Sequence, residues 1–152
     1  MVVKGRFSLD TNILVYAVDC ESGDRHERSK GLLAQAAKCD CVLTVQALAE
    51  FFHATTRQEL LQPAVARSFV RDWLEEFRIT SADEWAFADA MDAVEEHQLS
   101  FWDAMIWAAA RRIGCSAVIS EDMQDGRRLG GVEFINPFSG NAPARLAPLL
   151  KA

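Results

Sequence analysis

Short apolar segments alternate with longer helical patterns along the whole chain, and this alternation limits the possible folds more than any other feature. Five short segments read as strands: 6–9, 41–43, 78–80, 117–120 and 132–135. Parallel strands need crossover connections of about a dozen residues or more, usually a helix. We therefore expect an α/β fold, a three-layer α/β/α sandwich in which helices cover both faces of a mostly parallel sheet.

The segments between these strands carry helix start and stop signals. Thr44 is a candidate N-cap, Pro63 suits a first helical turn, Ser100 is a second candidate N-cap, and Gly114 suits the position after a helix. These signals and the apolar spacing predict helices at 11–18, from about 25 to 38, after Thr44, from Pro63, at 83–98 and at 100–113.

Length and composition indicate one globular domain. The chain has 152 residues, half of them apolar, which is enough to bury about 70% of the extended surface. We expect the main domain at 1–138, with 139–152 as its tail, either loosely packed or a short helix. No apolar run approaches the ~18 residues of a membrane span, so we expect a cytoplasmic protein with no membrane partner and four reduced cysteines.

The net charge of −6 at first argues against a nucleic-acid partner, because such proteins usually carry a basic face. However, 12 of the 16 basic residues are arginine, the better residue for bidentate phosphate contact. If several acids gather in one pocket, the remaining surface is less acidic than the total charge indicates.

The stretch Ser8-Leu9-Asp10-Thr11-Asn12-Ile13 places three polar side chains between two apolar runs. Such a group is either a turn with helix caps or a functional site. Functional crevices of open α/β sheets lie beyond the carboxyl ends of the strands. Four acids follow or approach these ends, and we expect them to converge: Asp10, Glu50, Asp103 and Asp122.

Converging carboxylates repel one another unless a cation lies between them. Magnesium prefers oxygen ligands and needs only one or two direct carboxylates, so a group without histidine or cysteine favours Mg²⁺ or Mn²⁺ over zinc. Simpler explanations exist. Asp10 and Asn12 could cap a helix, Asp103 completes a capping box with Ser100, and Glu121 and Asp125 could belong with Asp122 to a solvated turn.

Four motifs in this order resemble those of the PIN domain family: Asp10-Thr11-Asn12-Ile13-Leu14, Ala49-Glu50-Phe51, Phe101-Trp102-Asp103-Ala104, and Ser120-Glu121-Asp122-Met123-Gln124-Asp125-Gly126 followed by Asn136-Pro137-Phe138. The resemblance covers residues 7 to about 138. Within that superfamily, the size and the Asp-Thr-Asn opening are most similar to VapC-type toxins of bacterial toxin–antitoxin pairs.

This resemblance implies an endoribonuclease dependent on Mg²⁺ or Mn²⁺, in which a metal-activated water cleaves RNA and releases a 3′-hydroxyl and a 5′-phosphate. It also implies a homodimer and a cognate antitoxin. The four acids match the family's acidic positions, with Asp10 and Asp103 expected to bind metal directly and Glu50 and Asp122 through water or a second metal. Glu121 or Asp125 could assist or replace Asp122.

Several further residues are candidates for auxiliary roles. Thr11 and Asn12 would orient Asp10, and Ser120 would add a hydroxyl near Asp122. Five arginines close in sequence to the acidic motifs could contact RNA: Arg57, Arg111, Arg112, Arg127 and Arg128. We expect an antitoxin helix on the helices that carry Phe51–Phe52, Leu60–Leu61 and Phe69–Phe77.

Two other functions fit parts of the pattern. A magnesium phosphatase could use Asp10 as nucleophile, but the second aspartate of that motif is here Asn12. A PIN-like module that binds without catalysis would be favoured by loss of an acid, and all four acids are present.

Overall fold

The computed structural model describes residues 1–151 and has the alternating strand and helix order that the sequence predicts. Five strands lie within a residue or two of the predicted segments, and the structure adds one short strand. The strands are β1 (Phe7–Leu9), β2 (Val42–Thr44), β3 (Arg78–Thr80), β4 (Ala117–Ile119), β5 (Arg128–Leu129) and β6 (Val132–Ile135).

The strands form one nearly continuous sheet. Hydrogen bonds link β1, β4, β6 and β5 in that order, and β2 pairs with β3. A single parallel bridge between Phe7 and Cys41 joins the two parts, which gives the order β3-β2-β1-β4-β6-β5. All neighbours are parallel except β5 and β6. The prediction of a mostly parallel sheet is confirmed.

The helices cover both faces of this sheet. They are α1 (Thr11–Val18), α2 (Asp24–Ala36), α3 (Val45–Arg57), α4 (Pro63–Glu76), α5 (Glu84–His97), α6 (Phe101–Arg112) and α7 (Ala142–Leu146), with a 3₁₀ turn at Cys20–Ser22. Right-handed crossovers place α1–α4 on one face, because β1, β2 and β3 follow one another outward. The return to β4 on the other side of β1 places α5 and α6 on the opposite face.

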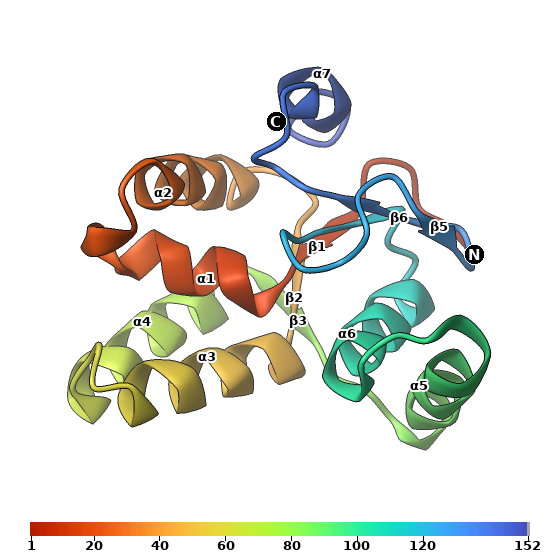
Figure 1. Cartoon of the computed structure of the whole chain (residues 1–152), viewed down its shortest axis with the longest axis horizontal. Coiled ribbons are helices and arrows are strands. Elements are labelled where there is room, and N and C mark those ends of the chain that lie inside the picture. Colours follow the sequence, from red (N-terminus) through yellow and green to blue (C-terminus); the bar gives the residue numbers. More distant parts are fainter. Residues whose placement is uncertain (152) are drawn as a thin grey trace.

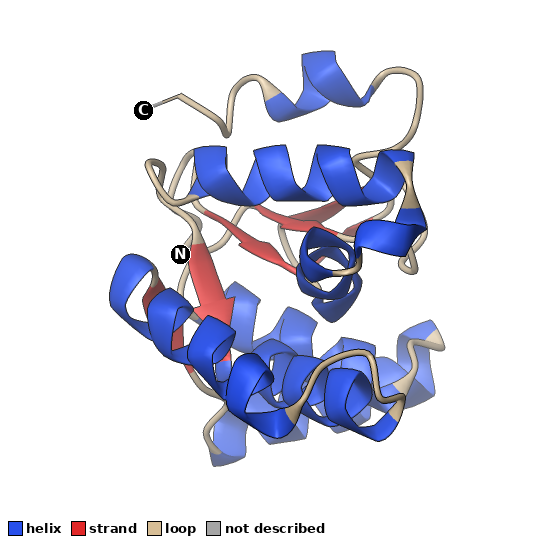
Figure 2. Cartoon of the chain, turned by 90° about the vertical axis from the view of Figure 1, so that its left-hand side faces the viewer, coloured by secondary structure: helices blue, strands red, loops and turns tan. Residues whose placement is uncertain are grey.

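The figures show these layers. In Figure 1, β2 and β3 run between α3 and α4 on one side and α6 on the other. Figure 2, turned by 90°, shows strands enclosed between helices above and below, with the last helix before the C-terminus at the top. The three-layer prediction is confirmed.

The predicted helix ends are also observed. Thr44 is the N-cap of α3 and accepts a hydrogen bond from the Ala47 N–H. Pro63 begins α4, and Ser100 is the N-cap of α6. Gly114 has φ +88°, a conformation that glycine adopts without steric cost and that ends the helix.

Two features differ from the expectation or complete it. The two-residue strand β5 was not predicted, because two residues are too few to show the alternation of apolar and polar side chains that marks a strand. The segment after residue 138 contains the short helix α7, whose Ala142 and Leu146 are buried. Arg145 on α7 also pairs with Asp125 and Glu133.

The core lies on both faces of the sheet and is formed mainly by aliphatic and aromatic side chains. Phe7, Phe51 and Phe134 are fully buried. Phe51 contacts Trp73 of α4 edge to face, with 4.7 Å between the ring centroids. All four cysteines are free. In the part of the chain that the structure describes, no helix is long and apolar enough to span a membrane.

Candidate functional site

The strand order reverses between β1 and β4, and the candidate site lies where these two strands end. From β1 the chain continues outward through β2 and β3, whereas β4 pairs with the opposite edge of β1. In open α/β sheets, ligands bind at such a switch point, beyond the carboxyl ends of the strands. The Asp10 N–H donates to the carbonyl of Ile119 over 2.9 Å, so Asp10 and the turn after β4 lie side by side.

Asp10 is the deepest of the four candidate acids. Its side chain is 3% exposed and accepts three hydrogen bonds. The Thr11 N–H donates over 2.7 Å, the Ser120 hydroxyl over 2.6 Å and the Asn12 amide over 3.2 Å. Asp10 is also the N-cap of α1, so the capping explanation holds for this residue together with its place at the site.

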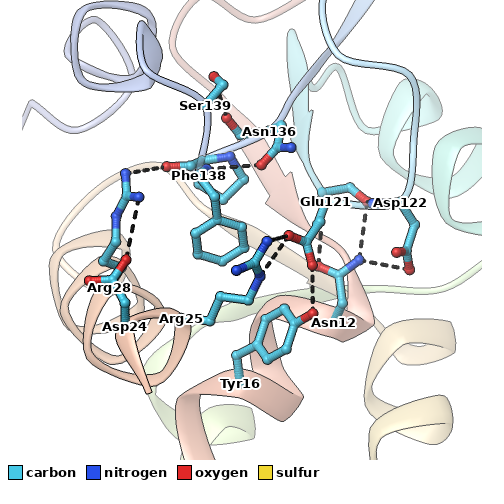
Figure 3. Close-up of polar contacts among 12 residues, drawn as sticks. Asn12, Tyr16, Asp24, Arg25, Arg28, Glu121, Asp122, Asn136, Phe138 and Ser139 are labelled. Atoms are coloured by element: carbon cyan, nitrogen blue, oxygen red, sulfur yellow. Dashed lines mark hydrogen bonds and ion pairs between the residues drawn. The ribbon is translucent and has the colours of Figure 1, made fainter. Parts of the chain in front are cut away.

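Asn12 connects Asp10 to Asp122. Its Nδ2 atom lies 3.0 Å from Asp122 Oδ2 and 3.3 Å from Ser120 Oγ, and its Oδ1 atom accepts from the Glu121 N–H over 3.4 Å. The Ser120 hydroxyl in turn accepts from the Asp122 N–H over 3.0 Å. One amide and one hydroxyl therefore bridge residues that are more than a hundred positions apart in sequence. Figure 3 shows Asn12 beside Glu121 and Asp122.

The other two acids approach from helices on opposite faces of the sheet. Glu50 lies on α3 and accepts a hydrogen bond from Gln46 over 3.0 Å. Asp103 lies in the first turn of α6, where its N–H donates to the Ser100 hydroxyl. The capping role of Ser100 is therefore real, and it leaves the Asp103 carboxylate partly exposed.

The pKa values of three acids are raised by burial and by neighbouring members of the group. Burial raises the pKa of Asp10 to about 7; hydrogen bonds from Ser120 and Thr11 oppose the rise, and the charges of Asp103 and Asp122 add to it. Burial also raises the pKa of Glu50, with a further rise from Asp103. Burial raises the pKa of Asp103 as well, and Asp122 adds to it. Asp10, Asp103 and Asp122 thus lie within electrostatic reach of one another, and Glu50 lies within reach of Asp103.

The donor set fits a hard divalent cation. Carboxylate oxygens that repel one another in a partly buried place are typical ligands of Mg²⁺ or Mn²⁺. Among residues 1–151, however, no three His, Cys, Asp or Glu side chains come close enough together to hold a metal ion. A Mg²⁺ site with one or two direct carboxylates and several waters does not require such a group.

Two neighbouring acids have other partners. Glu121 accepts hydrogen bonds from Tyr16 and Arg25, and the guanidinium of Arg25 lowers its pKa. Asp125 accepts from the Asn136 N–H over 2.8 Å and from Arg145 over 2.7 Å; these contacts outweigh burial and lower its pKa. Asp122 is the acid of this turn that contacts Asn12.

The structure does not bring the predicted arginines Arg111 and Arg112 to the acids. Both lie in the last turn of α6, about 12 Å along the helix from Asp103 at 1.5 Å per residue. Both pair with Asp89, at 3.7 and 2.7 Å respectively. Closeness in sequence to Asp103 was a misleading guide, because a helix separates residues by its length.

The remaining arginines are also arranged differently from the sequence expectation. Arg127 donates to the His97 carbonyl, Arg128 pairs with Glu133, and Arg57 is exposed in the last turn of α3. Arg25 of α2, which sequence reasoning missed, contacts Glu121 in the turn after β4. Nothing local indicates its role, because its partner Glu121 lies 96 residues away.

The predicted auxiliary residues lie at the acids. The Thr11 N–H, the Asn12 amide and the Ser120 hydroxyl all donate to Asp10. The Thr11 hydroxyl points elsewhere and lies 3.5 Å from the Ala47 carbonyl of α3. Thr11 therefore contributes to the site through its backbone.

Comparison with known proteins agrees with this architecture. Residues 8–127 match the PIN domain family, and the chain belongs to that family. No curated protein sequence matches it significantly.

Several solved structures share the fold. The sarcin-ricin loop cleaving toxin VapC20 of Mycobacterium tuberculosis superimposes with a TM-score of 0.61 at 22% identity, covering 74% of this chain and 86% of the toxin. A toxin–antitoxin complex from Klebsiella pneumoniae superimposes with a TM-score of 0.62 at 22% identity, covering 86% of this chain and 97% of the matched chain. A DNA-bound VapBC complex from Salmonella typhimurium superimposes with a TM-score of 0.61 at 17% identity, covering 88% of this chain and 97% of the matched chain. At these identities the likeness shows the fold.

Proposed function

We propose that this protein is a metal-dependent endoribonuclease and the toxin of a toxin–antitoxin pair. The observation that carries the proposal is the electrostatic coupling of Asp10 after β1, Asp103 of α6 and Asp122 of the turn after β4 at the switch point of a PIN-family sheet, with Glu50 of α3 coupled to Asp103. Proteins of similar fold include a toxin described as cleaving the sarcin-ricin loop, an RNA target, and toxin–antitoxin complexes.

Asp10 and Asp103 are the proposed direct metal ligands, and Glu50 and Asp122 would act through water or a second ion. Mg²⁺ or Mn²⁺ bound there would lower the pKa of a water and neutralise charge on the scissile phosphate. The protein's own groups prepare the ligands. Ser120, Asn12 and the Thr11 N–H fix both oxygens of Asp10.

The partners proposed are RNA, a cognate antitoxin and a second copy of the chain. Apolar side chains remain exposed on α3 and α4, namely Phe52, Val65 and Leu74. Some of them are the proposed contacts of an antitoxin helix, because exposed apolar side chains that gather on one face are typical of interaction sites. Trp73 and Phe77, which belong to one of the segments expected to carry these contacts, are core residues. Copurification with the antitoxin and molar mass from light scattering test both protein partners.

RNA cleavage by the purified protein tests the proposed activity. The protein is incubated with total cellular RNA and Mg²⁺ or Mn²⁺, and new 5′ ends are mapped. Wild type should give discrete ends that are absent with chelator and with Asp103→Asn. Identical end patterns for wild type and Asp103→Asn, together with no metal binding by calorimetry, would refute the proposed catalysis. The protein would then be a PIN-like module that binds without catalysis.

A further inference from the structure

A second polar cluster lies against the candidate site and centres on Glu121, the residue between Ser120 and Asp122. Tyr16 of α1 donates its hydroxyl to Glu121 Oε1 over 2.5 Å. Arg25 of α2 donates through Nε to Glu121 Oε2 over 2.7 Å, and its Nη2 makes a second contact with the same oxygen. Figure 3 shows both side chains converging on this carboxylate. Glu121 is therefore held from two helices.

Two aromatic rings hold the guanidinium of Arg25 in place. Its Cζ atom lies 4.9 Å from the ring centroid of Phe138 and 6.0 Å from that of Tyr16. The two rings contact each other edge to face at 5.7 Å. Phe138 is fixed in turn, because its N–H donates to Asn136 Oδ1 over 2.9 Å. A planar guanidinium that lies against two aromatic rings is pre-oriented toward its carboxylate partner.

The backbone of Glu121 connects this cluster to the acids. Its N–H donates to Asn12 Oδ1 over 3.4 Å, and the amide of Asn12 contacts both Asp122 and Asp10. Tyr16 lies one turn after Asn12 on α1. The side chain of Glu121 thus faces Arg25 while its backbone faces Asn12, so that holding the side chain also holds the turn that carries Asp122.

We propose that Arg25 is a positioning residue, which acts with Tyr16 through Glu121 to fix the turn at 120–122 and keep Asp122 beside Asn12 and Asp10. Its consequence for RNA cleavage rests on the proposed function. The alternative role for Arg25 is direct contact with an RNA phosphate. The contacts favour positioning, because the Nε–Nη2 edge of the guanidinium already binds Glu121 and the Phe138 ring lies against its face.

The chain offers a matched control in Arg28. This arginine also lies on α2 and over the Phe138 ring, at 5.5 Å, and donates to the Pro137 carbonyl over 2.8 Å. Neither of these contacts involves Glu121. Arg28→Ala therefore removes a similar charge and a similar aromatic contact without loosening the turn.

The first measurement is hydrogen exchange at the backbone amides of Glu121, Asp122 and Met123 in the full chain. These amides donate to Asn12 and Ser120. Arg25→Ala and Glu121→Gln should each speed their exchange about tenfold, which corresponds to 1.4 kcal/mol of opening free energy. Arg28→Ala should leave it unchanged. Unchanged exchange in Arg25→Ala would overturn the proposal, and this outcome is independent of any nuclease activity.

The second measurement is the kinetics of RNA cleavage. Misplacing Asp122 by about an ångström should lower kcat roughly 10- to 100-fold, with KM and its salt dependence unchanged. Arg25→Ala combined with Glu121→Gln should be no worse than either change alone. A rise in KM with a weaker salt dependence would instead assign Arg25 to an RNA phosphate. If wild type cleaves no RNA, the proposed function fails, and hydrogen exchange still decides whether Arg25 fixes the turn.

Discussion

The buried carboxyl of Asp10 makes a prediction about the stability of the metal-free protein. Burial raises its pKa from 3.8 to about 7, which corresponds to about 4 kcal/mol at 1.4 kcal/mol per pH unit. The folded carboxyl thus holds its proton more tightly than the unfolded one. Stability is therefore lost as pH rises through the window from about 4 to 7, and the full penalty applies above pH 7.

Asp10→Asn removes this titration. Integrated between pH 5 and pH 8, the free energy of unfolding of wild type should fall by about 3 kcal/mol relative to the variant. The NH₂ group of asparagine cannot accept a hydrogen bond, so at least one of the donors around Asp10 loses its acceptor. This loss should lower the free energy of unfolding by about 1–3 kcal/mol. The variant should therefore gain about 3 kcal/mol on wild type between pH 5 and pH 8 and be the more stable protein at pH 8, where wild type carries the full penalty.

Urea unfolding in EDTA, followed by circular dichroism at several pH values, measures this shift in relative stability. Asp125→Asn is the control, because the lowered pKa of Asp125 places its titration below this range, and its difference from wild type should be constant between pH 5 and pH 8. Parallel pH profiles for wild type and Asp10→Asn would refute the reasoning. Metal at about 100 times its Kd should restore about 2.7 kcal/mol to wild type at pH 8, and less to the variant.

Three smaller predictions concern residues away from the acids. Arg111→Ala and Arg112→Ala should keep kcat/KM for RNA within about threefold of wild type, because each loses a surface ion pair with Asp89, and Arg111 also a contact with the Trp107 ring, at the end of α6 away from the acids. Thr44→Ala should lower the free energy of unfolding by about 1 kcal/mol in urea titrations, since it removes the side-chain cap of α3. Gly130→Ala should cost about 1–2 kcal/mol in the same assay, because φ is +56° there.

The sequence predicted the fold well because its local signals agreed with one another. The spacing of the apolar residues, the N-cap residues and the residues that end helices all indicated the same element boundaries. Thr44, Pro63 and Ser100 begin helices as expected. The mostly parallel arrangement of the strands followed from the need for crossovers. The short strand β5 was missed, because its two residues pair only through the hairpin with β6.

The candidate site was predictable where strand ends determine position. Asp10 and Ser120 follow adjacent parallel strands, so their contact could be inferred from topology alone. The arginines were not predictable in this way, because long side chains reach partners that depend on packing between elements. Arg25 meets Glu121 across 96 residues, whereas Arg111, eight residues from Asp103, lies at the other end of α6.

The pairing of β1 with β4 also determines when the site can form during folding. Asp10 and Ser120 are separated by 110 positions, and β4 must pair with β1 before they meet. Closing so long a loop costs entropy that only the completed sheet repays. Helices α1 to α4 and strands β1 to β3 can be synthesised, and can pack locally, without any of the contacts between Asp10 and the turn after β4. A nascent chain that ends between Asp103 and Ser120 therefore contains Asp10, Glu50 and Asp103 but no assembled site.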